Sequence, residues 1–118
     1  MGGSKSAINW NDMPEVPYRA SRLFRALSNP KTYALCRLLL EEGRMETGEM
    51  VRRLDRSPST ISRILRALKD LNIVRYQKAD SGTWYTTKHT GQLRRLLDAT
   101  EAYVRRADPD LGIKNRIE

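Results

Sequence analysis

The sequence is poor in the two side chains that most often bind metals, with one cysteine and one histidine among 118 residues. A single cysteine excludes an intrachain disulfide and fits the reducing cytosol. Even a symmetric dimer would bring only two thiols together, whereas zinc and softer ions require several nitrogen or sulfur ligands at fixed geometry. We therefore expect a cytoplasmic protein with no metal and no cofactor.

Long apolar runs and catalytic motifs are also missing. No apolar run is long enough for a signal sequence or a transmembrane helix. Residues 1–6 formally match an N-myristoylation pattern, but a flexible lead or a cloning remnant explains them more simply. Because the sequence offers no nucleophile–base pairing, phosphate-cradling glycine loop or metal cluster, we expect no enzymatic activity.

Acidic residues are outnumbered, at 14 against 22 lysines and arginines, which gives a formal net charge of +8. The excess is concentrated between Arg52 and Lys78, where eight residues are basic and two are acidic. A polyanion is therefore the favoured partner. An anionic membrane surface is disfavoured, because no helix combines a basic face with a bulky aromatic face.

The stretch from Ser57 to Asn72 predicts a helix with two different faces. Ser57 is a good N-cap, and Pro58 suits the first helical position. At about 100° per residue, the apolar residues gather on one face, and short hydroxyls and guanidiniums lie opposite: Ser59, Ser62, Arg63 and Arg66. This pattern suits a helix in a DNA major groove, where arginine pairs with guanine and hydroxyls reach phosphates or bases. An ordinary amphipathic surface helix would fit the same pattern.

A basic hairpin is expected directly after this helix. Asn72 can adopt the left-handed conformation that ends a helix. Residues 73–78 and 83–87 read as strands, and 79–82 read as the turn between them. A capped helix that runs into a basic two-stranded ribbon is the order of a winged helix-turn-helix.

Here the sequence resembles the ArsR/SmtB family of small repressors. The resemblance rests on Ala26-Leu27-Ser28-Asn29-Pro30, on Ser59-Thr60-Ile61-Ser62-Arg63-Ile64-Leu65 and on the 73–87 hairpin, and it spans about residues 17–107. It implies a mainly α-helical winged helix-turn-helix fold with a small β-hairpin: four helices, two strands and a final helix, in a homodimer. The implied function is a DNA-binding transcriptional regulator, in the first instance a repressor, whose grip on DNA an effector loosens.

The other elements follow from periodicity and breakers. Apolar residues at helical spacing predict a first helix from Tyr18, and Asn29 with Pro30 caps a second helix that ends at Gly43. A third helix is expected over 46–54. Residues 1–16 are expected to be a flexible lead, 17–107 the domain with a dimerisation helix at each end, and 108–118 a tail.

The last helix carries an apolar stripe that needs a partner once the hairpin has closed the small core. The resemblance implies a dimer in which the first and last helices of two chains pack together. The expected interface residues are Leu23, Phe24, Leu93, Leu96, Leu97 and Val104. The alternative is that this helix folds back on its own domain.

The expected DNA contacts come from the capped helix and the hairpin: Ser57, Ser59, Thr60, Ser62, Arg63, Arg66, Arg75 and Lys78. In metal-sensing members of the family a Cys-x-Cys pair lies where this chain has Glu46 and Gly48, so that site is absent. Cys36 is interpreted as a small buried hydrophobe, with a redox role as the minor alternative. Two other functions stay open: a non-specific architectural DNA-binding protein, and a winged-helix adapter that binds proteins.

Overall fold

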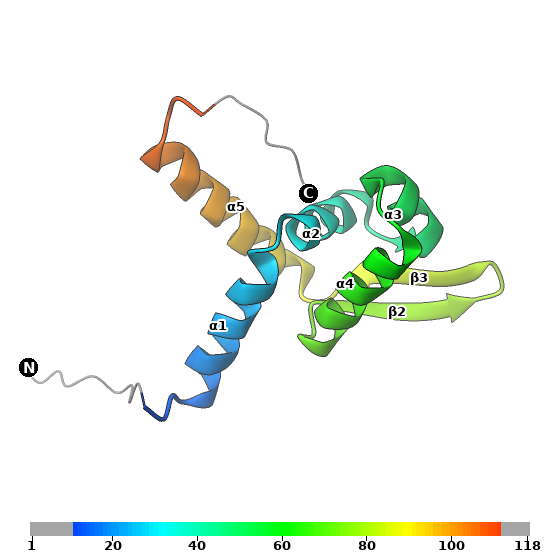
Figure 1. Ribbon diagram of the computed structural model, residues 1–118, viewed down its shortest axis with the longest axis horizontal. Helices are drawn as coiled ribbons and strands as arrows, with labels where there is room; N and C mark the ends of the chain where they lie inside the picture. Colours follow the sequence, from blue (N-terminus) through cyan, green and yellow to red (C-terminus); the bar gives the residue numbers. More distant parts are fainter. Residues whose placement is uncertain (1–10, 112–118) are drawn as a thin grey trace, which may run out of the picture.

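The computed structural model describes residues 11–111, which form five helices and three short strands (Figure 1). In chain order they are α1 (Glu15–Leu27), α2 (Pro30–Glu42), β1 (Met45–Glu46), α3 (Thr47–Leu54), α4 (Pro58–Asp70), β2 (Val74–Ala79), β3 (Gly82–Thr87) and α5 (Thr90–Ala107). This is a winged helix-turn-helix, as predicted. The expectations for residues 1–10 and 112–118 lie outside the described residues.

The helix ends follow the local signals in the sequence. Asn29 caps α2 by accepting from the backbone N–H of Lys31, and Ser57 caps α4 by accepting from that of Thr60. Gly43 ends α2 with φ of +86°, and Asn72 follows α4 with φ of +61°. Both are left-handed positions that glycine and asparagine adopt at low cost. These predicted caps are confirmed.

The sheet has three strands, whereas the sequence predicted two. Met45 and Glu46 form β1 and pair antiparallel with Tyr85 and Trp84 of β3, so the strand order is β1-β3-β2. The predicted start of α3 at Glu46 is therefore wrong, and the helix begins at Thr47. A two-residue strand is too short to show the alternation of apolar and polar residues that predicts a strand from sequence. β1 is a strand only because it pairs with β3.

The core lies between α2, α3, α4, the sheet and the start of α5. Its fully buried members include Leu35, Leu39, Ile61 and Leu68. Each such side chain contributes roughly 1.5–3 kcal/mol by leaving water. From α1, by contrast, only Leu27 is buried. Figure 1 accordingly shows α1 and α5 diverging from the rest of the domain on the side opposite the hairpin.

The first helix begins earlier than predicted, at Glu15 and not at Tyr18. Pro14 is its N-cap, and Pro17 lies in the first turn, where a missing N–H leaves no helical hydrogen bond unmade. None of the helices within residues 11–111 is long and apolar enough to cross a membrane.

Candidate nucleic-acid interface

The start of α4 presents a cluster of hydroxyl groups. The Ser57 hydroxyl donates to Thr60 Oγ1 at 2.9 Å and lies 3.2 Å from Ser59 Oγ. Arg63 Nη2 lies 3.5 Å from the same Thr60 oxygen, so Thr60 steadies the arginine one turn further along the helix. These groups stand at the positive end of a helix, where backbone N–H groups and the helix dipole attract phosphate oxygens.

The two faces of α4 are separated as the sequence predicted. Ile61, Ile64, Leu65 and Leu68 are buried. Ser59, Ser62, Arg63 and Arg66 are all exposed, on the opposite side of the helix. Among residues 11–111 no ion pair involves a residue of α4 or of the hairpin. The positive charge of this helix is therefore available to a partner.

The hairpin divides its two predicted contact residues between opposite faces. Because successive strand residues alternate, Arg75 and Lys78, three residues apart, point to opposite sides of β2. Lys78 shares its side with Tyr76, whose ring lies 5.0 Å from Lys69 Nζ of α4. Arg75 shares the other side with Trp84 of β3. Lys78 therefore continues the surface of α4, and Arg75 does not.

Three residues that the sequence analysis missed fill the angle between α4 and the hairpin. Lys69 lies over Tyr76, and the ring centroids of Tyr76 and Tyr85 are 5.9 Å apart. A hollow of about 250 Å³ between α4 and β3 is lined by Ser62, Leu65, Arg66, Lys69 and Tyr85. The position of Lys69 three residues after Arg66, on the same helix face, was a usable signal. The tyrosines had none, because only the folded sheet brings them under α4.

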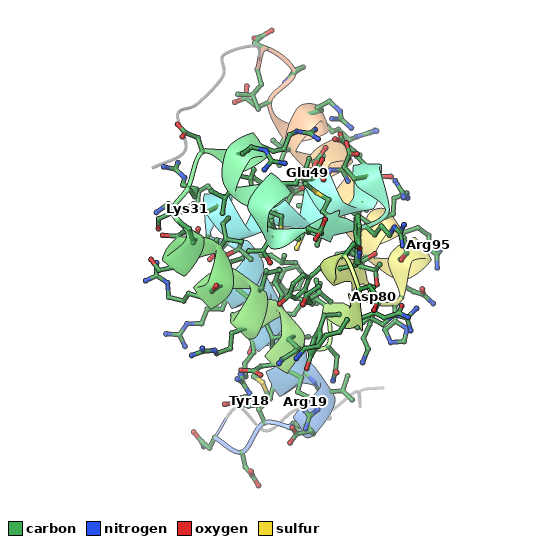
Figure 2. The ribbon with its side chains drawn as sticks, turned by 90° about the vertical axis from the view of Figure 1, so that its right-hand side faces the viewer. Tyr18, Arg19, Lys31, Glu49, Asp80 and Arg95 are labelled. Carbon is green, nitrogen blue, oxygen red and sulfur yellow. The ribbon has the colours of Figure 1, made fainter. Side chains whose placement is uncertain are left out.

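Figure 2 views the molecule from the hairpin side, with α4 on its left and Asp80 of the hairpin turn labelled. The turn itself carries Asp80 and Ser81 and no basic residue. Trp84 Nε1 donates to Ser81 Oγ at 3.2 Å, and the Arg44 guanidinium stacks 4.3 Å from the Trp84 ring centroid. Cations therefore lie on both faces of the hairpin, Lys78 on one, and Arg75 with Arg44, which precedes β1, on the other.

The expected dimer residues separate into two groups. Leu93 and Leu97 are only 7% and 1% exposed, because they pack into the core of their own chain. For these two residues the interface prediction is corrected to the alternative, intrachain packing. The reason is that the first turns of α5 pack against the core, and only its later turns project away from the domain.

An exposed apolar surface nevertheless remains on α1 and α5. Phe24 is 55% and Val104 45% exposed, and Leu23 and Leu96 are half-buried. Two further exposed apolar residues on these helices were not predicted, Val16 of α1 at 79% and Tyr103 of α5 at 75% exposed. Such exposure of large apolar side chains on two projecting helices is typical of an interaction surface.

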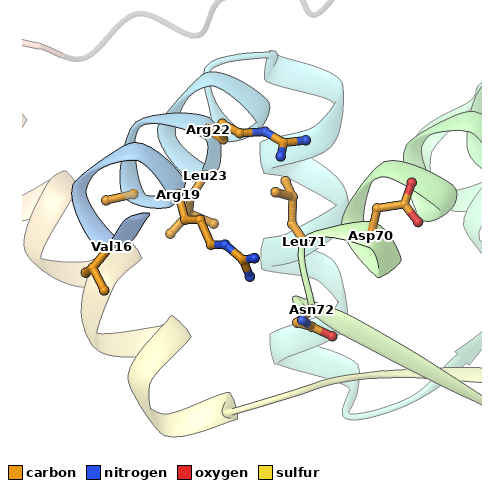
Figure 3. Close-up of a pocket in the computed structure, with 8 residues that line it drawn as sticks. Val16, Arg19, Arg22, Leu23, Asp70, Leu71 and Asn72 are labelled. Carbon is orange, nitrogen blue, oxygen red and sulfur yellow. The ribbon is translucent and has the colours of Figure 1, made fainter. Parts of the chain in front are cut away.

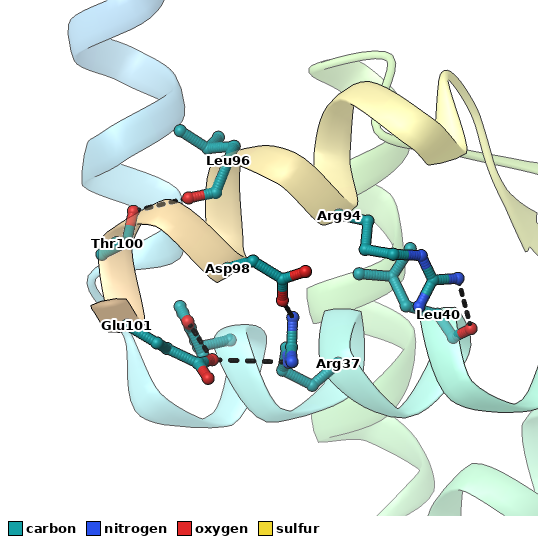
Figure 4. Close-up of polar contacts among 8 residues, drawn as sticks. Arg37, Leu40, Arg94, Leu96, Asp98, Thr100 and Glu101 are labelled. Atoms are coloured by element: carbon teal, nitrogen blue, oxygen red, sulfur yellow. Dashed lines mark hydrogen bonds and ion pairs between the residues drawn. The ribbon is translucent and has the colours of Figure 1, made fainter. Parts of the chain in front are cut away.

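A polar network fixes α5 against α2 (Figure 4). Arg37 of α2 pairs with Asp98 at 2.9 Å and Glu101 at 3.4 Å, and Tyr33 donates to Glu101 at 2.6 Å. Burial and the bond to Glu101 raise the pKa of Tyr33 to about 12. The bond to Asp98 also raises the pKa of Arg37. These contacts set the direction in which α5 leaves the domain.

The candidate ligands for a metal or a redox signal do not come together in the described part of the chain. Within residues 11–111 no group of three histidine, cysteine or acidic side chains could hold a metal ion. His89 is the exposed N-cap of α5. Cys36 is completely buried, and burial raises the pKa of its thiol to about 12. A thiol in that state is a poor nucleophile.

Comparison with known proteins agrees with this geometry. Residues 27–77 match a family model described as a helix-turn-helix domain. The structure is similar to the transcriptional regulator HlyU from Vibrio vulnificus, with 25% identity, a TM-score of 0.59, and coverage of 79% of this chain and 98% of that one. No curated protein sequence matches this chain.

Two further solved structures resemble more of the chain. The homodimeric winged helix-turn-helix domain Mb0332 from Mycobacterium bovis, a possible ArsR-family regulator, has 15% identity and a TM-score of 0.70 over 95% of this chain and 99% of that one. AntR, an antimony-specific transcriptional repressor, has 18% identity and a TM-score of 0.69 over 92% and 93%.

The chain is therefore a winged helix-turn-helix protein, with its helix-turn-helix domain in residues 27–77. Within that class its fold is similar to those of Mb0332, a possible ArsR-family regulator, and of the repressor AntR, in line with the resemblance that the sequence indicated.

Proposed function

We propose that this chain is a sequence-specific DNA-binding regulator that acts as a homodimer and represses transcription from a partly palindromic operator. The observation that carries the proposal is the exposed face of α4. It presents Ser59, Ser62, Arg63 and Arg66 with no acidic neighbour paired to them among residues 11–111. Hydroxyls and unpaired guanidiniums on one helix are the groups that read base edges in a major groove.

In this proposal α4 lies in the major groove with its N-terminal half toward the bases. Arg63 pairs with a guanine edge, and Ser59 and Ser62 reach bases or phosphate. Lys69 and Lys78 hold the backbone beside the helix. The Ser57 and Thr60 hydroxyls, held by the cap, meet a phosphate at the helix start. Arg66 contacts either a base or the backbone, and Arg75 reaches the DNA from the far face of the hairpin.

Dimerisation is proposed through α1 and α5. Support comes from the exposure of Phe24, Tyr103 and Val104 and from the homodimeric state of the similar domain Mb0332. Leu96 contributes its exposed portion. Two recognition helices related by a twofold axis would read half-sites about one helical turn, roughly 34 Å, apart.

The proposal is of a cytoplasmic binding protein, not of an enzyme. AntR is an antimony-specific repressor, but we propose a different signal for this chain. Within residues 11–111 no cluster of metal ligands exists, and the only thiol is buried. A small organic molecule, a partner protein or protein concentration alone would then control DNA binding.

Selection of bound DNA from a random library tests the proposal most directly. A regulator should enrich one operator and prefer it over bulk DNA by about 10³-fold or more. Enrichment of no sequence, with tight binding to all DNA, would favour the architectural alternative suggested by the formal charge of +8. Failure to bind DNA at all would favour the protein adapter.

On the selected operator, Arg63→Ala should cost about 1–3 kcal/mol and relax selection at one base position. Arg66→Ala should either do the same or weaken all sequences alike, as expected for a phosphate contact. Arg95→Ala removes an exposed arginine that lies outside α4 and the hairpin and is the matched control. If both α4 substitutions leave operator affinity unchanged, α4 is not the reading helix.

A further inference from the structure

A groove separates α1 from the C-terminal end of α4. It consists of two adjoining hollows of about 410 Å³ each, which share Arg22, Asp70 and Leu71 in their walls. The groove exists because α1 buries only Leu27 and stands away from the domain. Each hollow is within the size range of small-molecule sites, roughly 300–1,000 Å³.

The floor of the groove is apolar and its rim is cationic. Half-buried Leu23 and Leu71 form the floor with the small side chains of Ala20, Ala26 and Ala67. Three guanidiniums, those of Arg19, Arg22 and Arg25, and one carboxylate, that of Asp70, line the groove. Figure 3 shows the Arg19 and Arg22 side chains reaching from α1 toward Leu71 at the end of α4.

Two of these cations have no acidic partner within residues 11–111. Arg19 is paired with Glu15 at 2.6 Å. Arg22 has only the ring of Tyr18, 5.9 Å away, and it forms no ion pair with Asp70 across the groove. Arg25 is likewise free of an ion pair in the described chain. A planar guanidinium fork matches the two oxygens of a carboxylate, so the rim is suited to an anion whose apolar body lies on the leucines.

We propose that this groove binds an organic anion with an aliphatic body, a monocarboxylate being the simplest form, and that this ligand is an effector of DNA binding. The carboxylate contacts Arg22, which lines both hollows, and the chain lies between Leu23 and Leu71. The effector role rests on the proposed function, whereas the binding site itself does not.

The groove lies between the proposed dimerisation helix and the proposed recognition helix, the two elements through which an effector can change DNA binding. One wall is α1, the proposed dimerisation helix, and the other is the end of α4, the proposed recognition helix. Arg22 and Phe24 are two residues apart on α1 and therefore point to opposite sides, about 200° around the helix. A partner subunit on the Phe24 side leaves the Arg22 side open. If α1 and α4 can adopt two spacings, a ligand that binds one spacing more tightly increases its population. Operator affinity then changes by an amount that the ligand's difference in affinity for the two spacings sets.

The test uses the full chain and compares octanoate with octan-1-ol, which differ in the charged group, by calorimetry. Octanoate should bind about tenfold or more tightly than the alcohol, since only the anion makes charge-assisted hydrogen bonds. Arg22→Gln should weaken octanoate binding about tenfold, with Arg22→Lys in between. Arg95→Gln, an exposed neutralisation outside the groove, should leave it unchanged. Circular dichroism confirms that each variant folds.

Equal binding of acid and alcohol, an unchanged affinity in Arg22→Gln, or no binding of octanoate at millimolar concentration would each overturn the site. The effector role is measured separately, as a change in operator affinity with octanoate in wild type that is lost in Arg22→Gln. Octanoate binding without any effect on operator affinity would overturn the effector role. If the chain binds octanoate but does not bind DNA, the proposed function is refuted and the proposed binding site in the groove is retained.

Discussion

Phe24→Ala probes the proposed dimer at its most informative position. Phe24 is 55% exposed in the single chain, so about half of its side chain is available to a partner. Full burial of a phenylalanine is worth about 1.5–3 kcal/mol, and half of that is about 0.8–1.5 kcal/mol. In a twofold dimer the same residue counts once from each subunit. The loss is then about 1.5–3 kcal/mol, which raises the dimer Kd about 10- to 150-fold.

Sedimentation equilibrium over a range of protein concentrations measures this Kd. Alanine favours helix, so the substitution leaves α1 intact. Tyr76→Ala is the matched control, because Tyr76 is 46% exposed but lies on β2, away from α1 and α5. An unchanged dimer Kd in Phe24→Ala, or a wild-type chain that stays monomeric at micromolar concentration, would refute the α1–α5 dimer.

Leu97→Ala distinguishes dimer contacts from core packing in the same experiment. Leu97 is 1% exposed, so its truncation should lower the free energy of unfolding of the chain by about 2–5 kcal/mol. Urea unfolding should therefore respond strongly to Leu97→Ala and weakly to Phe24→Ala.

Three other predictions address the hairpin, the signal and the titrating groups. Lys78→Gln should reduce the log–log salt slope of DNA binding by about 0.9, with a smaller change for Arg75→Gln on the opposite face; two unchanged slopes would exclude the hairpin as a phosphate clamp. Zinc, cadmium, arsenite and peroxide should leave the DNA complex intact, both in wild type and in Cys36→Ser. Release of the DNA by a metal would contradict the proposed absence of a metal signal. Release by peroxide in wild type alone would make Cys36 the sensor. Burial raises the pKa values of Cys36 and Tyr33 to about 12 from 9.0 and 10.0, so the folded chain retains these protons above the pH at which the unfolded chain loses them. Their contribution to stability is full below pH 9 and is lost as the pH rises toward 12; urea unfolding at several pH values should show this fall, and Cys36→Ala and Tyr33→Phe should each flatten it.

The sequence by itself determined the features that depend on near neighbours in the chain. The cap at Ser57, the left-handed residue at Asn72 and the two faces of α4 each need only a few adjacent residues, so local chemistry predicts them. Because side chains alternate between the two faces of a strand, the sequence alone also predicts that Arg75 and Lys78 lie on opposite faces of the hairpin.

Tertiary structure decided the features that join distant segments. β1 exists because Met45 pairs with Tyr85 across 40 positions of the chain, and Arg37 meets Asp98 from a helix 61 residues away. The apolar stripe of α5 was visible in the sequence, but its division was not. Leu93 and Leu97 face the core while Val104 faces solvent, because the core ends partway along α5, and its extent depends on how α2 and the sheet pack together.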